Sequence, residues 1–138
     1  MRILLIVTAF IEVATGLALA AWPSVPVALL LGSSLETPAG IIVARLAGAA
    51  LLSLGVACWL ARCDEQSRST TGLVAALLLY NAAAASLLVF ARLGLGLDGI
   101  LLWPGVALHA VLAVWCIACL RNKLKQQADT HTEEHGFK

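Results

Sequence analysis

Four apolar stretches, each long enough to cross a membrane, dominate the pattern of hydrophobic and polar positions along the chain. A membrane-spanning helix needs about 20 apolar residues to cross a hydrocarbon core of roughly 30 Å. The pattern therefore predicts an all-α membrane protein, with one four-helix transmembrane domain over residues 1–120. The expected spans are about residues 3–21, 39–61, 72–93 and 99–120. Helix-breaking residues stand between them: Pro23, Pro26, Pro38, Gly94, Gly96 and Gly99.

The apolar segment VPVALLLGSSL, residues 25–35, is too short to cross a bilayer. Backbone groups without hydrogen bonds are costly in hydrocarbon, so such a segment belongs at the interface or over the end of the bundle. We expect a short helical cap or interfacial segment after the first span. A plain apolar loop is the alternative.

Composition supports the membrane assignment. Of 138 residues, 61% are hydrophobic and 12% are charged, and the mean hydropathy is +0.94. Soluble domains contain about 45–50% apolar residues, and a soluble protein of this size could not bury the excess. The net charge of +1, without any basic block, argues against a nucleic-acid partner. The expected partners are membrane lipids, with a membrane protein or a second copy of the chain as further candidates.

The positive charges predict the orientation. Lys and Arg precede the first span, separate the second from the third and follow the fourth: Arg2, Arg62, Arg68, Arg121, Lys123 and Lys125. Because cytoplasmic segments carry the excess of Lys and Arg, both termini are expected in the cytoplasm. Residues 121–138 then form a polar cytoplasmic tail, which we expect to be disordered beyond a short helical extension.

The first span also has features of a secretory signal, namely Arg2, an apolar run and the small-residue pattern Ala18-Leu19-Ala20. Cleavage there would leave three spans. Glu12 lies in the middle of the run, and a buried acid suits a retained helix with partners better than a disposable leader. We therefore expect four spans, and an intact mass would test this.

Each span carries a polar residue that is costly to place among lipid chains and is therefore expected to face the bundle interior. The set comprises Glu12, Arg45, Tyr80, Asn81 and His109. A rise of about 1.5 Å per residue places Glu12, Asn81 and His109 near the middle of their spans, with Arg45 closer to the outer face. We predict a buried, charge-assisted hydrogen bond between Glu12 and Arg45.

Small residues accompany this cluster at helical spacing. Thr8, Thr15 and Gly16 share the face of Glu12, and Gly48 shares that of Arg45. The spacings Ala44-x-x-x-Gly48 and Ala49-x-x-x-Ser53 are typical of close helix packing in membranes. Gly105, Ala113 and Cys116 likewise share the face of His109, which predicts an inward histidine.

The polar cluster has two interpretations. It can form a pocket that holds a ligand head group or passes a proton, or its members can satisfy one another and fix the helix register. A b-type haem usually needs two axial ligands, and His109 is the only histidine inside a span. No cofactor is therefore predicted, although a quinone remains an alternative ligand.

The four cysteines form a separate candidate thiol site. Cys58 and Cys63 lie at the cytoplasmic end of the second span, and Cys116 and Cys119 at that of the fourth, where stable disulfides are not expected. Cys116-x-x-Cys119 could present two sulfurs to one metal. However, helical angle points Cys58 away from the Arg45 face, and places Cys63 on that face if the helix extends to it. Small buried hydrophobes are the competing interpretation, and no metal site is predicted.

Other signatures of chemistry are weak. His131-x-x-x-His135 has metal-compatible spacing but lies in the polar tail, where a solvated tail is the simpler interpretation. No Walker loop, nucleophile elbow or dinucleotide fingerprint occurs in the sequence.

Four short spans, a mid-membrane acid in the first, and Ala44-Arg45-Leu46-Ala47-Gly48 early in the second together resemble the small bacterial four-helix membrane proteins of the DoxX-like kind. The resemblance covers about residues 1–120 and implies a bacterial inner-membrane location. Some proteins of this kind are linked to quinone-dependent oxidation and others to binding or assembly. No defined catalytic set is matched, so no catalytic residue is assigned.

Two functions follow as hypotheses. The favoured one is a non-enzymatic membrane protein that binds a lipophilic small molecule or a partner membrane protein through the polar cluster. The alternative is an oxidoreductase accessory or isomerase, in which Glu12 and His109 exchange protons with a quinone or lipid.

Overall fold

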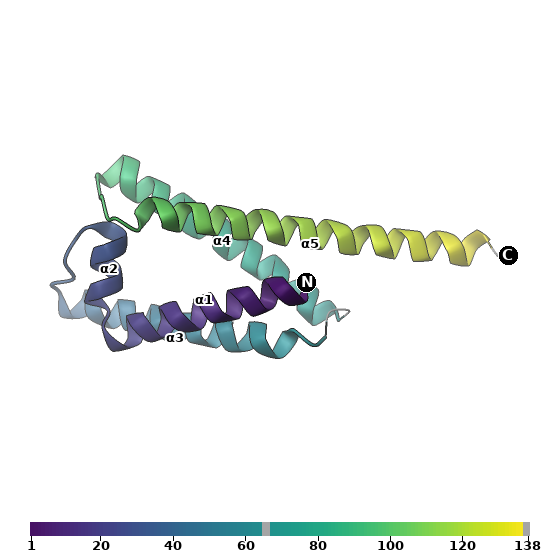
Figure 1. Cartoon of the computed structure of the whole chain (residues 1–138), viewed down its shortest axis with the longest axis horizontal. Helices are drawn as coiled ribbons and strands as arrows, with labels where there is room; N and C mark the ends of the chain where they lie inside the picture. Colours follow the sequence, from purple (N-terminus) through teal and green to yellow (C-terminus); the bar gives the residue numbers. More distant parts are fainter. Residues whose placement is uncertain (65–66, 137–138) are drawn as a thin grey trace.

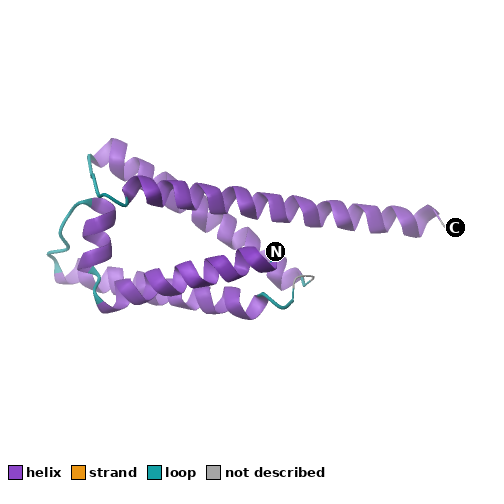
Figure 2. Ribbon diagram, in the orientation of Figure 1, coloured by secondary structure: helices purple, strands orange, loops and turns teal. Residues whose placement is uncertain are grey.

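The structure, a computed structural model, describes the backbone of residues 1–64 and 67–136 and the side chains of residues 1–64 and 67–126. These residues form five helices and no strand (Figure 2). The helices are α1 (Arg2–Ala21), α2 (Ser24–Leu31), α3 (Pro38–Ala61), α4 (Arg68–Leu95) and α5 (Leu102–Gly136). Within the described part, α1, α3, α4 and residues Leu102–Gln126 of α5 are long and apolar enough to cross a membrane. The predicted all-α, four-span architecture is confirmed.

Local sequence determines where the helices begin and end. The Thr37 hydroxyl accepts a hydrogen bond from the Gly40 amide at 3.1 Å and begins α3, and Ser67 begins α4 in the same way through the Thr70 amide. Gly32 and Gly96 end α2 and α4 in the left-handed conformation, with φ of 67° and 68°. These are the polar and glycine-containing gaps between the apolar stretches.

The spanning helices pack as two pairs, α1 with α3 and α4 with α5 (Figure 1). The pairs meet at the end that carries the N-terminus and diverge toward α2. At the end that carries the N-terminus, a core of buried side chains joins the two pairs: Leu4, Leu5, Ala9, Cys58, Val74, Leu77, Leu112 and Cys116. The two pairs are therefore held together at one end and separated at the other.

Glycine lets α1 and α3 approach closely. A Cβ atom on Gly48 would lie 2.8 Å from both the Ala20 amide nitrogen and the Gly16 carbonyl oxygen. Any residue other than glycine at position 48 would therefore force the two backbones apart. Small residues allow the same close approach in other pairs of membrane helices. Ala49 and Ser53 are exposed instead, and the Ser53 hydroxyl donates to the Ala49 carbonyl.

The short helix α2 bridges the open end between the pairs (Figure 1). The Leu101 amide donates to the Leu29 carbonyl at 2.9 Å, which ties the end of α2 to the start of α5. A Cβ on Gly99 would lie 2.3 Å from the Leu30 carbonyl group, so only glycine allows this approach. The expected helical cap is confirmed, and the apolar-loop alternative is wrong.

The N-terminus, the α3–α4 connection and the C-terminal part of α5 lie on the same side of the molecule (Figure 1). The opposite end carries Arg92, whose Nε lies 3.6 Å from Asp98 Oδ1. The charge-bearing segments that predicted the orientation are thus at one end.

The tail differs from the expectation of disorder, because α5 continues without interruption to Gly136. Residues 122–128, NKLKQQA, consist mainly of good helix formers. They extend a helix whose costly first turns have already formed in the spanning segment. The side chains of His131 and His135 lie outside the described residues.

Candidate functional site

A hydrogen bond between α4 and α5 forms the centre of the polar cluster. His109 Nδ1 lies 2.8 Å from Asn81 Oδ1, and Asn81 Nδ2 donates to the Leu77 carbonyl at 2.8 Å. Asn81 is fully buried and His109 is half-buried. The pair secures α5 against α4 within the apolar interior, where an unsatisfied amide would be costly.

This arrangement also fixes the proton on the imidazole ring. A backbone carbonyl only accepts, so the side-chain atom of Asn81 that faces Leu77 must be the amide nitrogen. The other atom, facing His109, is then the carbonyl oxygen, which also only accepts. His109 must therefore donate from Nδ1, and Nε2 is the acceptor nitrogen of the neutral ring.

Tyr80 and Glu12 extend the cluster toward α1. The Tyr80 and His109 rings meet edge to face with centroids 5.7 Å apart. Glu12 is only 2% exposed and lies within electrostatic range of Tyr80 and Cys58. Its carboxyl group makes no hydrogen bond or ion pair to the described residues.

Arg45 lies outside this cluster, and the predicted bond to Glu12 is not formed between them. The Arg45 side chain is exposed on α3. The close contact of Gly48 and Gly55 with α1 determines which face of α3 points inward. At 3.6 residues per turn, Arg45 and Cys58 lie about 70° to opposite sides of that face. Cys58 is on the side that packs into the core and is buried, whereas Arg45 is on the exposed side. An exposed arginine near a helix end can extend toward the interface.

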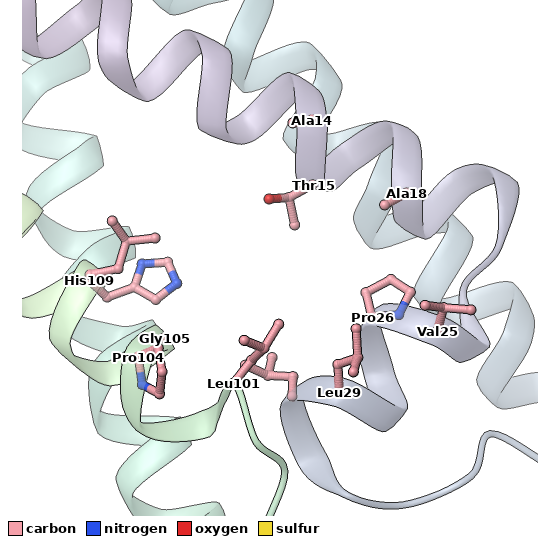
Figure 3. A pocket seen from close by; sticks show the side chains of 12 residues that line it. Ala14, Thr15, Ala18, Val25, Pro26, Leu29, Leu101, Pro104, Gly105 and His109 are labelled. Carbon is pink, nitrogen blue, oxygen red and sulfur yellow. The ribbon is translucent and has the colours of Figure 1, made fainter.

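An open cavity lies beside His109, between α1, α2 and the start of α5 (Figure 3). Its volume is about 500 Å³, within the roughly 300–1,000 Å³ of small-molecule sites. The lining residues are Ala14, Thr15, Ala18, Val25, Pro26, Leu29, Leu30, Leu101, Pro104, Gly105, Leu108 and His109. Ten of these twelve residues are apolar, so the walls suit a lipophilic molecule.

Two polar groups face this cavity. The His109 ring projects into it from α5, and the Thr15 hydroxyl points into it from α1 (Figure 3). Neither His109 Nε2 nor the Thr15 hydroxyl has a hydrogen-bond partner among the described residues. The cavity therefore combines apolar walls with free hydrogen-bonding groups on facing sides.

The sequence pointed to His109 but missed the cavity, because its walls are apolar residues of three separate helices. Gly105 gave one signal, since it lies one turn before His109 on the same helix face and lines the cavity. Thr15 was expected beside Glu12, but the structure divides them. Glu12 is buried in the bundle, whereas Thr15 faces the open space.

The cysteines do not form one site. Cys58 and Cys116 are buried in the core that joins the helix pairs, Cys63 is exposed beyond the end of α3, and Cys119 is half-buried. All four are free thiols. The part of the chain that the structure describes holds no group of three or more His, Cys, Asp or Glu side chains suited to a metal ion. Cys58 and Cys116 act as small buried side chains here.

Comparisons of the chain with models of protein families, with curated proteins and with solved structures found no match. The DoxX-like resemblance therefore stays a prediction from the sequence, and the function must be argued from the geometry of the cavity.

Proposed function

We propose that this multi-pass membrane protein is a non-enzymatic binder that holds a lipophilic small molecule in the cavity beside His109. The observation that carries the proposal is the cavity itself, of about 500 Å³, with apolar walls and the imidazole at its edge. Burial of a ligand's apolar body against these walls supplies affinity, and a few polar groups orient it. Tyr80 and Asn81 contact the His109 ring and help to hold its orientation.

The position of the cavity supports this role. It lies at the open end of the two helix pairs and is bounded there by α2, whose own residues form part of its wall. A lipophilic molecule from the bilayer can reach such a site without crossing water. The proposed setting is the bacterial inner membrane with both termini in the cytoplasm, in keeping with the positive charges near the terminal end.

Filling the cavity tests the proposal. Ala14→Phe places a ring in the cavity, whereas Ala47→Phe adds the same ring on an exposed position of α3 outside the cavity lining. The protein is purified in mild detergent, and native mass spectrometry records the molecules that remain bound. We expect the parent and Ala47→Phe to carry the same bound mass and Ala14→Phe to lose it. Equal retention by all three proteins would show that the cavity is not the binding site.

Proton exchange is the second candidate function. Tyr80 favours it, because its ring contacts His109 and its hydroxyl lies within electrostatic range of Glu12. However, Glu12 does not line the cavity. His109→Phe separates the two candidates: a binder loses ligand affinity, whereas an oxidoreductase accessory acting on a quinone keeps binding and loses turnover.

A further inference from the structure

The geometry points to the chemical class of the ligand: we propose a lipid-like molecule whose polar end carries a hydroxyl group that donates a hydrogen bond to His109 Nε2. The inference rests on the proposed binding function and makes it specific. It depends on the order of hydrogen bonds from the Leu77 carbonyl through Asn81 to His109.

In this series of hydrogen bonds, each group determines whether the next one donates or accepts. The Leu77 carbonyl orients the Asn81 amide, and the Asn81 carbonyl oxygen holds the proton on His109 Nδ1. Asn81 is fully buried, so water does not compete for this position. The neutral ring therefore presents an acceptor, rather than a donor, to the cavity.

The facing wall matches a hydroxyl group as well. Thr15 presents its own hydroxyl to the cavity (Figure 3), and no described residue bonds to it. A ligand hydroxyl both donates and accepts, so it can pair with either wall. A ketone or an ether can only accept, and would leave Nε2 facing it without a proton between them. That mismatch of two acceptors removes a hydrogen bond within apolar walls.

The experiment compares three photoreactive probes on the full-length protein in lipid nanodiscs. They are a long-chain fatty alcohol with a diazirine in its chain, its methyl ether, and the ketone of the same length. Labelled peptides are mapped by mass spectrometry, and the half-saturating concentration is measured for each probe. We expect the alcohol to label the cavity lining at about tenfold lower concentration than the ether or the ketone, the effect of one hydrogen bond.

Variants test the source of the preference. His109→Phe should abolish the difference between the alcohol and the ether while both still label the cavity. Asn81→Leu frees the proton to move to Nε2, so the preference for the alcohol over the ketone should shrink. Asn81 is a positioning residue, and this change in preference is a readout that a purely structural role would not produce. Ser86→Ala removes an exposed hydroxyl of α4 and should leave all three curves unchanged.

The outcomes distinguish this inference from the proposal beneath it. If all three probes saturate the cavity equally, or the ketone binds best, the hydroxyl inference is wrong while the binding function stands. If none of the probes saturates at the cavity, the binding function fails with it. Crosslinks between two copies of the chain at these residues would show that a protein surface occupies the cavity, and would overturn both. If Asn81→Leu does not fold, the comparison of probes on the parent protein still decides the question.

Discussion

Gly48→Ala gives the sharpest test of how the α1–α3 pair is built. The added Cβ would lie 2.8 Å from two backbone atoms of α1, and backbone cannot rotate away as a side chain can. Overpacking of this kind costs about 1–3 kcal/mol. Alanine regains about 0.5–1 kcal/mol in helix preference, so we expect a net loss of about 1–2 kcal/mol in the free energy of unfolding.

Gly72→Ala is the matched control. Gly72 also lies inside a spanning helix, but a Cβ there would meet nothing within 4 Å. This variant should gain up to about 1 kcal/mol from helix preference alone. The two variants should therefore differ by about 2 kcal/mol, or roughly thirtyfold in the unfolding equilibrium.

Reversible unfolding in mixed micelles, followed by circular dichroism as the denaturing detergent fraction rises, measures both variants. Gly55→Ala should fall between them, because the nearest atom to its Cβ is a Val13 methyl group at 2.7 Å, which can shift. Gly48→Ala as stable as Gly72→Ala would refute the close glycine contact, and with it the position of α1 at the edge of the cavity.

Three further predictions follow from the described contacts. Glu12→Gln should change the free energy of unfolding by less than about 0.5 kcal/mol in the same assay, because no hydrogen bond or ion pair of the carboxyl group is lost. A coupling energy above about 1 kcal/mol in a double-mutant cycle with Arg45→Leu would instead show that Glu12 and Arg45 interact. A polar maleimide should label exposed Cys63 in the folded protein but reach Cys58 and Cys116 only after denaturation, and labelling of Cys63 from the periplasmic side of intact cells would contradict the proposed orientation. Arg92→Ala should lower the free energy of unfolding by less than about 1 kcal/mol, since Asp98 is exposed. A larger loss would mean that this ion pair stabilises the α4–α5 turn more than exposed ion pairs do.

Hydrophobic length predicted the spans because the bilayer imposes a minimum that few sequences meet by chance. The expected ends lie within a few residues of those of α1, α3 and α4. The end of α5 was not predicted, since a change to polar residues marks where a helix leaves the membrane, and not the residue at which the helix itself ends. The short apolar run at residues 25–35 left helix and loop open. In the structure its first part belongs to α2, which ends at Leu31, and residues 32–35 are not helical.

The polar cluster was predicted only in part. Asn81 and His109 meet as their shared depth suggested, because a buried amide and an imidazole both need partners. Arg45 was misplaced because residues assigned to one helical face can still lie about 60° apart around the helix. Gly48, assigned to the face of Arg45, contacts α1, whereas Arg45 is exposed. The cavity could not be predicted at all. It arises where two helix pairs diverge, and that angle depends on packing between residues far apart in the sequence.

The nitrogen-15 spectrum of the His109 ring shows whether the imidazole holds a lipophilic ligand. It is recorded in lipid nanodiscs while the long-chain alcohol is added. His131 and His135 are replaced by Gln, so that His109 supplies the only imidazole signals. We expect a protonated Nδ1 throughout and an unprotonated Nε2 resonance that shifts as the alcohol binds, with no shift in the Ala14→Phe protein. A proton on Nε2 before the alcohol is added, or a spectrum that the alcohol leaves unchanged, would contradict a lipophile held at the imidazole.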